Sequence, residues 1–372
     1  MTKRVLVLGG YGNFGRFICQ ELAKDANIQL LVAGRSMEKA KDFVQTLPVS
    51  NVPSPVQLDV QVDMSQALHT LQPDLVINTV GPFQGQSYDV PNACIAAGCH
   101  YVDLADGREF VANIGSLNSA AKTREVAIIA GASSVPALSS AVMDKYLPQF
   151  CSLDGVEYGI STAQHTTRGL ATTQAVLSYA GKPIQTIIDG ANQAVVGWQG
   201  IKPYQFEALG KRWLSHCDVP DLALFPARYP TLKSIRFYAG LELALQQFGV
   251  WCLSWLVRIG FISNLADLAK MLLKASFLFD RFGGDESGFF MKLDGQGKQN
   301  TPKSLVFELV AKSGHGPLIP CMPAILLAKK LAADQKFKHG AYPCVGLIGL
   351  DEYLKGLAGL DISWTVRSEP SS

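Results

Sequence analysis

The stretch GGYGNFGRF, residues 9–17, places four glycines at the end of an apolar run, RVLVLG at residues 4–9. The run predicts a strand, and the residues from Asn13 onward predict a helix. In this setting the pattern G-x-G-x-x-G is typical of a turn that binds a dinucleotide. The six residues of the pattern are our predicted contacts to the dinucleotide: Gly10, Tyr11, Gly12, Asn13, Phe14 and Gly15.

Each glycine of the pattern has a physical role. Gly10 permits the tight turn, Gly12 lets a pyrophosphate approach the backbone, and Gly15 lets the helix and the strand pack closely. The free N–H groups at the start of the helix then face the phosphates. The alternative is that the glycines serve only the turn from strand to helix.

The chain that follows indicates which dinucleotide is bound. A protein that binds NAD places an acid roughly 20 residues further on, at the end of the second strand. This chain has Arg35 and Ser36 there, and no carboxylate. A guanidinium can hold a 2′-phosphate with two charge-assisted hydrogen bonds, and Ser36 can cap its helix and donate to the same phosphate. We therefore predict NADP in preference to NAD; a solvated surface arginine is the alternative.

Short runs rich in Val, Ile and Leu alternate with helical patterns over residues 1–150. After the first run they are IQLLVAG (28–34), PVQLDV (55–60), DLVINTVG (74–81), HYVDLA (100–105) and VAIIAG (126–131). Such an alternation predicts a parallel sheet that is covered on both faces. We expect an α/β fold in which residues 1–150 form a Rossmann domain, a doubly wound sheet whose ligand lies where the strand order reverses.

Residues 151–316 have a different pattern. Strands predominate, and several of them alternate apolar with polar residues, for example VEYGIST at 156–162. This predicts a second, α+β domain with a mixed or antiparallel sheet that binds the substrate and forms a dimer. Residues 317–358 predict two helices, separated by a loop at 340–346. The strand DISWTV (361–366) and a frayed tail, RSEPSS, follow.

Residues 241–282 are the most apolar part of the chain and predict a helical hairpin. Four polar residues form one narrow stripe because they are spaced by multiples of four: Glu242, Gln246, Ser254 and Arg258. A membrane span would need about 20 residues without such a stripe. A helix that is apolar nearly all round must be covered. We expect burial or contact with a second subunit, hence a homodimer; a patch on a membrane surface is the less favoured alternative.

Composition excludes several classes of partner and site. Lysine and arginine number 33 against 31 acids, a net charge of +2, so the summed charge would not hold a nucleic acid. The eight cysteines include no C-x-x-C and the six histidines no H-E-x-x-H, so we predict no metal site. The first residues lack the pattern of a signal peptide, and we expect a cytoplasmic protein.

Further segments carry a resemblance to a known family. They are AGRSMEKA (33–40), VINTVGPF (76–83), HYVDLADGREF (100–110), AGASSVPALSS (130–140), GHGPLIPCMPA (314–324) and GAYPCVGL (340–347). Together with GGYGNFG (9–15), they make the chain similar over most of its length to the saccharopine dehydrogenase-like (saccharopine reductase-type) oxidoreductases. The resemblance implies a Rossmann domain that binds NADP and a second domain with a mixed sheet. It also implies that the helices of residues 317–358 pack back on the Rossmann domain.

The resemblance also implies roles for particular residues. Asp59 would lie near the adenine; a solvated acid at a strand end is the alternative. Four residues would run along the ribose and the nicotinamide: Val80, Gly81, Pro82 and Phe83. A turn at Gly81-Pro82 without a ligand is the alternative.

The chain also departs from the family pattern. Family members often carry Gly-Glu after the Tyr-x-Asp strand, whereas this chain has ADGR at 105–108. This difference puts a catalytic step that depends on the acid in doubt. Residues 241–282 are too apolar for an amino-acid product, so saccharopine is not our predicted substrate.

Hydride transfer belongs to the cofactor, and the protein needs to supply only orientation and one proton donor. Asp103 and Asp106, after the fifth predicted strand, are our candidate catalytic acids; helix capping is the alternative. Ser133, before a helix, is a candidate substrate contact or cap. The second domain offers further candidates for a proton or an anion clamp, which could equally be ordinary loop residues: His165, Arg168 and His315.

These observations favour an NADP-dependent oxidoreductase that acts on a small or moderately apolar carbonyl, imine or enoyl compound. A protein that binds NADP(H) without turnover, as a scaffold at a membrane periphery, is the alternative. Its support is the lack of an unambiguous acid–base residue.

Overall fold

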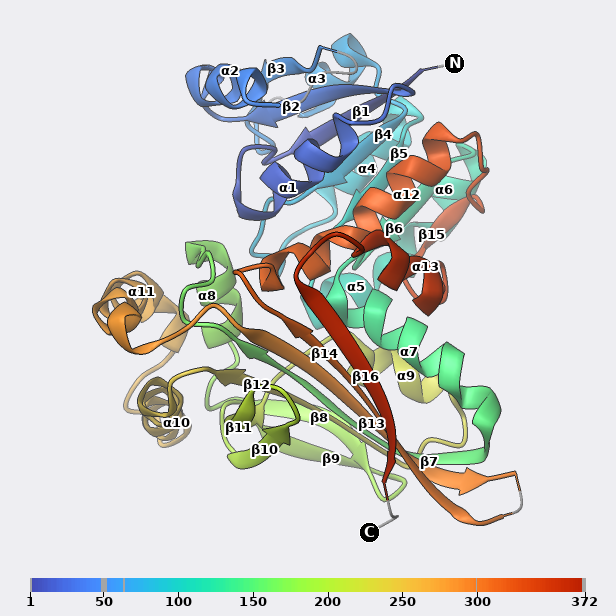
Figure 1. Cartoon of the computed structure of the whole chain (residues 1–372). Coiled ribbons are helices and arrows are strands. Elements are labelled where there is room, and N and C mark those ends of the chain that lie inside the picture. The colour runs from blue at the N-terminus through green and yellow to red at the C-terminus, as the bar shows by residue number, and fades with distance from the viewer. Residues whose placement is uncertain (1, 48–51, 63, 299, 370–372) are drawn as a thin grey trace. The chain divides into compact units, whose positions relative to one another are not determined.

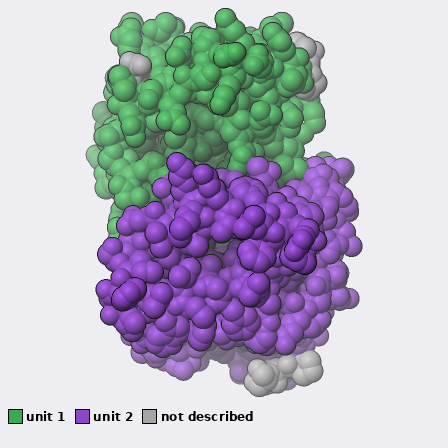
Figure 2. Space-filling view, turned by 90° about the vertical axis from the view of Figure 1, so that its left-hand side faces the viewer, with its two compact units in different colours: residues 1–140, 318–356 green, residues 141–317, 357–372 purple. Residues whose placement is uncertain are grey.

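The computed structural model describes residues 2–47, 52–62, 64–298 and 300–369. The chain folds as two compact units, which Figure 2 colours separately. The first unit comprises residues 1–140 and 318–356, and the second comprises residues 141–317 and 357–372. The functional roles that we expect of the two parts of the chain stay predictions.

The first unit is built on a seven-stranded sheet whose paired strands all run parallel (Figure 1). The strands are β1 (Lys3–Leu8), β2 (Ile28–Gly34), β3 (Ser54–Gln57), β4 (Leu75–Asn78), β5 (His100–Asp103), β6 (Ala127–Ala130) and β15 (Gly340–Pro343). Their order is β15-β6-β5-β4-β1-β2-β3, so the direction of winding reverses between β1 and β4. This is the doubly wound arrangement that the sequence predicts, and the prediction is confirmed.

Helices cover the sheet of the first unit. They are α1 (Asn13–Leu22), α2 (Met37–Gln45), α3 (Met64–Leu71), α4 (Asp89–Ala97), α5 (Arg108–Ala112), α6 (Asn118–Thr123), α12 (Met322–Ala332) and α13 (Leu350–Gly356). α1 buries Ile18 and Leu22, which lie one turn apart and face the same side. The central strands are buried at nearly every position, as expected for a parallel sheet with both faces covered.

One element of this unit differs from the prediction. The segment 340–346 is not all loop, because residues 340–343 form strand β15, which extends the sheet beside β6. The backbone nitrogen of Gly340 donates to the Val126 carbonyl at 2.8 Å, and that of Cys344 donates to the Ala130 carbonyl at 2.7 Å. Four residues, GAYP, carry too little periodicity to indicate a strand; the pairing partner decides the conformation.

The second unit is built on a mixed sheet with the order β10-β11-β12-β7-β13-β14-β16 and a separate hairpin, β8–β9. The strands are β7 (Phe150–Thr162), β8 (Pro183–Ile188), β9 (Ala191–Val196), β10 (Lys202–Phe206), β11 (Gly210–His216), β12 (Ser234–Leu241), β13 (Ser287–Gly297), β14 (Pro302–Ala311) and β16 (Ile362–Glu369). β12 runs parallel to β7, and the other pairs are antiparallel. The expected mixed sheet is confirmed, while β10 and β11 were not predicted.

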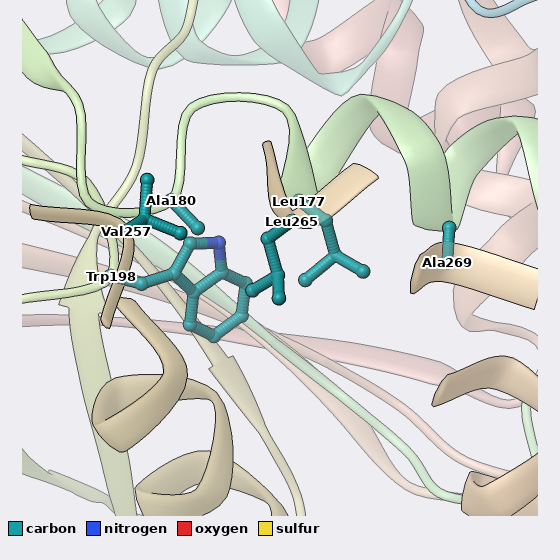
Figure 3. Packing of buried hydrophobic residues seen from close by; sticks show 6 residues of the cluster. All are labelled: Leu177, Ala180, Trp198, Val257, Leu265 and Ala269. Carbon is teal, nitrogen blue, oxygen red and sulfur yellow. The ribbon is translucent and has the colours of Figure 1, made fainter. Parts of the chain in front are cut away.

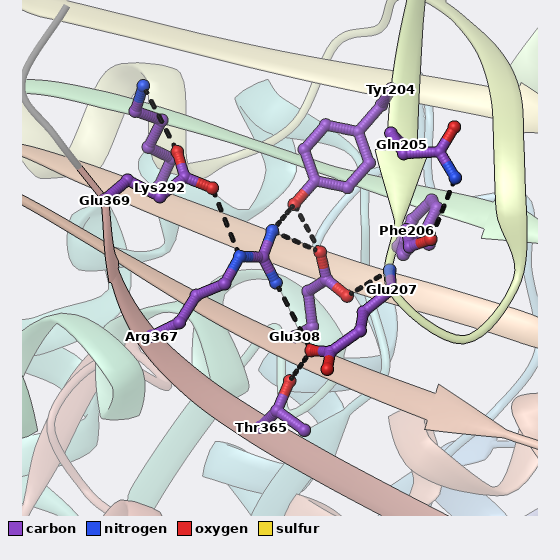
Figure 4. A network of polar contacts seen from close by, with 9 residues as sticks. All are labelled: Tyr204, Gln205, Phe206, Glu207, Lys292, Glu308, Thr365, Arg367 and Glu369. Atoms are coloured by element: carbon purple, nitrogen blue, oxygen red, sulfur yellow. Dashed lines mark hydrogen bonds and ion pairs between the residues drawn. The ribbon is translucent and has the colours of Figure 1, made fainter.

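The last strand is longer than expected. β16 pairs with β14 through Glu369, so residues 367–369 of the expected frayed tail are ordered in the sheet, and residues 370–372 lie outside the described residues. A polar network holds this strand (Figure 4). Arg367 Nη2 lies 2.8 Å from Glu308 Oε1, and the hydroxyl of Tyr204 donates to the same oxygen at 2.7 Å. Glu308 is almost fully buried, so the network satisfies a charge that would otherwise be costly.

The apolar segment forms α10 (Ala244–Arg258) and α11 (Ala269–Ser276), with 3₁₀ turns η4 (Leu265–Leu268) and η5 (Phe277–Phe282). Its inner side packs with α8 (Leu170–Leu177) around the buried ring of Trp198 (Figure 3). The polar stripe does not mark the outer face, because Ser254 is completely buried. Within the parts of the chain that the structure describes, we find no helix of the length and apolarity that a bilayer span requires.

Candidate nucleotide-binding site

The glycine turn lies between β1 and α1, at the carboxyl edge of the first sheet. The backbone nitrogen of Gly12 donates to the Gly9 carbonyl at 2.8 Å, which closes the turn, and that of Gly10 donates to the Ala33 carbonyl at 2.9 Å. A Cβ at Gly15 would overlap the Gly9 carbonyl, so only glycine lets α1 begin this close to β1. The expected tight packing of helix and strand is present.

The start of α1 offers unpaired donors. Gly12 is the N-cap residue and has no side chain to accept from the helix, and the first helical hydrogen bond is from Arg16 N to Gly12 O, at 2.9 Å. The N–H groups of Asn13, Phe14 and Gly15 accordingly have no acceptor among the residues that the structure describes. Three free N–H groups at the positive end of a ten-residue helix form a site for an anion.

Tyr11 connects this turn to the end of the second strand. Its hydroxyl accepts a hydrogen bond from the backbone nitrogen of Ser36 at 2.9 Å, and its ring lies against Gly34, where a Cβ would overlap it. Arg16 Nε donates to the Tyr11 carbonyl at 3.0 Å. The sequence predicted Tyr11 as a contact to the cofactor; the structure shows in addition that it holds the turn and the β2–α2 connection together.

Arg35 and Ser36 lie in that connection. Ser36 caps α2, since its hydroxyl accepts from the backbone nitrogen of Lys39 at 3.3 Å. The side chain of Arg35 is exposed, and no carboxylate of the described chain pairs with it. Gln57 Nε2 donates to its carbonyl at 3.3 Å and so holds its backbone. The guanidinium is therefore available to a phosphate.

A second loop, residues 79–83, lies beside the glycine turn across the point where the strand order reverses. The hydroxyl of Thr79 donates to the Leu8 carbonyl at 2.7 Å, and the Val80 nitrogen donates to Asn78 Oδ1 at 3.0 Å. Val80, Gly81 and Pro82 are half-buried, and the peptide bond between the last two is cis. The loop thus presents its backbone at the position where ligands of this fold bind.

Phe83 and Asp59 are placed differently from the other predicted contacts. The ring of Phe83 is buried against that of Phe110, with 5.4 Å between the ring centroids, and it lies beside Gly81 of the same loop. The carboxylate of Asp59, after β3, accepts from the Gln61 nitrogen at 3.1 Å and shapes its own turn. A role for either residue toward the cofactor stays a prediction.

Asp103 ends β5 and is completely buried. Its Oδ1 accepts from the backbone nitrogens of Gly131 at 2.7 Å and Ala105 at 2.9 Å, whereas Oδ2 accepts no hydrogen bond of ordinary geometry from the described residues. Burial raises the pKa of Asp103 to about 7, against the opposing effect of these hydrogen bonds. A proton on Asp103 would remove the cost of burying its negative charge.

Sequence reasoning missed one member of the cluster around this carboxyl, Asn78. Tyr101 and Asn78 are buried beside it, and Asn78 Nδ2 donates to the Tyr101 hydroxyl at 3.1 Å. The available signal was a polar residue at the end of each of two adjacent apolar strands, LVIN and HYVD. Parallel strands bring such ends together, so the pairing of β4 with β5 could have been used to find the cluster.

Asp106 and Ser133 lie at the same edge of the sheet as Asp103. Asp106 is half-buried, its Oδ1 accepts from Gln84 Nε2 at 3.2 Å, and burial raises its pKa. Ser133 is buried and precedes the π-helical turn η2 (Ser134–Leu138), but its hydroxyl does not cap that turn. The Ala132 nitrogen donates to the Asp103 carbonyl at 2.7 Å, which ties the two loops together.

In the second unit the structure brings His165 and Arg168 together on Asp280. Arg168 Nη2 lies 2.6 Å from Asp280 Oδ1, and His165 Nε2 lies 2.7 Å from the Asp280 carbonyl. The hydrogen bond from Arg168 lowers the pKa of Asp280. The guanidinium also lies over the ring of Phe277, at 4.3 Å from its centroid. These contacts hold the loop that contains His165 and Arg168 against η5. The charge of Arg168 is already paired with that of Asp280.

His315 is separate from that pair. Its ring nitrogen Nδ1 accepts from the backbone nitrogen of Asp361 at 2.8 Å, and the backbone nitrogen of His315 donates to the Lys312 carbonyl at 3.0 Å. The ring therefore supports the approach to β16. Its predicted role toward a substrate, like those of His165, Arg168 and Ser133, stays a prediction.

Comparison with known proteins agrees with this geometry. Residues 5–133 match the family described as saccharopine dehydrogenase NADP binding domain. The resemblance is thus confirmed for this part of the chain, and the match supports the binding of NADP(H). Comparison with curated proteins finds no significant match.

Solved structures show the fold. Apo saccharopine dehydrogenase (L-Glu forming) from Saccharomyces cerevisiae has a TM-score of 0.66 at 14% identity and covers 98% of this chain and 100% of its own. Amine dehydrogenase from Mycobacterium smegmatis has a TM-score of 0.49 at 13% identity and covers 93% and 95%. The first likeness extends over both units of the fold.

Proposed function

We propose that this chain, whose residues 5–133 match the saccharopine dehydrogenase NADP binding domain, is an NADP-dependent oxidoreductase. The observation that carries the proposal is the row of free N–H groups at Asn13, Phe14 and Gly15, which lies at the point where the strand order reverses. The diphosphate would bind there, and the loop at 79–83 would lie along the ribose and the nicotinamide. When bound, NADPH supplies a hydride.

We further propose that NADP is preferred over NAD through Arg35. Its guanidinium, which forms no ion pair with the described residues, and the hydroxyl of Ser36 would hold the 2′-phosphate. The backbone of this turn is already held by Tyr11 and Gln57, so little further ordering is needed on binding.

The proposed substrate is a small or moderately apolar carbonyl, imine or enoyl compound. Support for an oxidoreductase comes from the match of residues 5–133 and from the fold; the apolar residues 241–282 pack on the core of the second unit or face outward, so they do not decide the polarity of the substrate. Incubation of the purified protein with NADPH and a panel of the three compound classes tests this. The proposal predicts that absorbance at the NADPH band falls with at least one class; a panel without any turnover would contradict it.

Asp106 is the stronger of the two proposed proton donors. It is half-buried, and its raised pKa keeps a proton on the carboxyl at higher pH than usual. Asp103 is sealed from solvent and holds the loops at Ala105 and Gly131, so we propose that it positions Asp106. Asp106→Asn should lower kcat and remove a pH-dependent limb of the rate profile, whereas NADPH affinity should stay within about twofold.

The alternative function is that of a protein that binds NADP(H) without turnover. It is supported by the burial of Asp103 and by the pairing of Arg168 with Asp280, which leave few free groups for catalysis. Tight NADPH binding without consumption of NADPH on the full panel would favour it. The expected homodimer and cytoplasmic setting also stay proposals; sedimentation velocity and cell fractionation test them.

A further inference from the structure

The outer face of α10 is apolar, although it is exposed. Leu245, Phe248, Trp255 and Ile259 are spaced as one side of a helix, and Leu245 and Ile259 are 69% and 70% exposed. The inner face of the same helix packs on the core around Trp198. The outer side of α10 is therefore apolar, and no residue that the structure describes covers it.

The same kind of surface continues through α11 and η5. Phe261, in the connection, is 82% exposed, and Leu278 is 76% exposed; Met271 and Phe282 are exposed as well. α10 and α11 lie at the left of Figure 1, the side that Figure 2 turns toward the viewer. We call the outward side chains of residues 245–282 the α10–η5 surface.

Basic residues alternate with the apolar ones on the second half of this surface. Lys270, Lys274 and Arg281 are exposed, and within the described ranges no carboxylate forms an ion pair with them. Of the two acids in residues 245–282, Asp280 is already paired with Arg168, which leaves Asp267. The surface therefore combines exposed aromatic and aliphatic side chains with an excess of positive charge.

The positive charge distinguishes between two partners that could cover this surface, a second copy of the chain and a lipid bilayer. In a symmetric dimer the same patch lies on both subunits, so two copies meeting here would bring like charges into a desolvated interface. An anionic lipid surface has the opposite charge and can accept exposed Trp, Phe and Leu side chains at the headgroup level. We propose that the α10–η5 surface docks on the surface of a lipid bilayer that contains anionic headgroups. The inference is independent of the proposed enzyme activity.

Flotation with vesicles of phosphatidylcholine, alone or with phosphatidylglycerol, tests the proposal. The full chain should float with the anionic vesicles, and the floating fraction should fall as salt is raised. Each basic residue near an anionic surface contributes about a fivefold gain in affinity, so K270E/K274E/R281E should lose at least about a hundredfold. I259S/F261S/L278S should lose binding to a similar extent.

Matched controls separate docking from a general loss of structure. W364S/V366S removes exposed apolar side chains of β16, and K336E/K338E reverses two exposed charges near β15; both should float like the parent chain. All variants should melt at the temperature of the parent chain. A chain that does not float, or that floats equally with neutral vesicles and with the charge-reversed variant, would overturn the proposal. A dimer that I259S/F261S/L278S converts to monomer, without any vesicle binding, would assign the surface to a second copy instead.

Discussion

The hydroxyl of Tyr11 accepts a hydrogen bond from the backbone nitrogen of Ser36 at 2.9 Å, across 25 residues of chain. This contact joins the turn that would hold the diphosphate to the connection that would hold the 2′-phosphate. The two halves of the candidate cofactor site are thus fixed relative to each other within the first unit.

We expect Tyr11→Phe to lower the free energy of unfolding by about 1 kcal/mol, because the Ser36 nitrogen loses its acceptor while the ring still packs on Gly34. Urea unfolding measures this. The matched control is Tyr342→Phe. The hydroxyl of Tyr342 donates to the Lys338 carbonyl at an exposed position, so its loss should lower the free energy of unfolding less. Equal effects of the two substitutions would argue against a structural role for the Tyr11 contact.

Gly15→Ala should disrupt the glycine turn. The added Cβ would overlap the backbone carbonyl of Gly9, so the helix must shift. We expect the free energy of unfolding to fall by about 1–3 kcal/mol and the affinity for NADPH to fall at least about tenfold. Gly115→Ala is the matched control, because a Cβ there meets no atom within 4 Å. It should change neither quantity measurably. Unaltered NADPH affinity in Gly15→Ala would contradict the close helix–strand packing that we describe.

Asp103 should make the stability depend on pH. Its pKa of about 7 lies above the ordinary value of 3.8, so between these values the folded chain holds a proton that the unfolded chain has lost. Stability contributed by this group is present below about pH 4 and is lost as the pH rises to about 7, on the order of 4 kcal/mol in total. Urea unfolding from pH 4 to pH 8 should show this decline in the parent chain and a smaller one in Asp103→Asn. Equal slopes would contradict the raised pKa.

Arg367→Ala should destabilise the second unit by about 3 kcal/mol, because it leaves the buried carboxylate of Glu308 without its cation. Lys233→Ala removes an ion pair to Asp154 in which the lysine side chain is 66% exposed. That control should change the unfolding free energy by less than about 1 kcal/mol. Thermal unfolding monitored by circular dichroism would distinguish the two, and equal losses would contradict the burial of the network.

Much of the first unit could be predicted from the sequence, because in a parallel sheet strand and helix patterns differ sharply. The start of α1 at Asn13 and the cap at Ser36 are where the sequence indicates. Strand β15 and the place of Asn78 beside Asp103 do not follow from these local patterns alone. Both depend on which strands pair across the sheet, and local periodicity carries no information on that pairing.

The apolar segment shows a different limit. Periodicity identified its polar stripe, but the stripe does not reveal which side of the helix faces the core. Ser254 is buried on the same inner side as Val257, whereas Leu245 and Ile259 are exposed. The direction of a helix that is apolar all round is decided by tertiary packing.

Isothermal titration calorimetry of the purified chain with NADPH and NADH, on the parent and on Arg35→Asp, tests the central claim most directly. The account predicts that NADPH binds the parent on the order of 10- to 100-fold more tightly than NADH, and that the aspartate variant loses this difference. Equal affinity of the parent for both nucleotides would contradict the role of Arg35. No binding of either nucleotide would contradict the site itself.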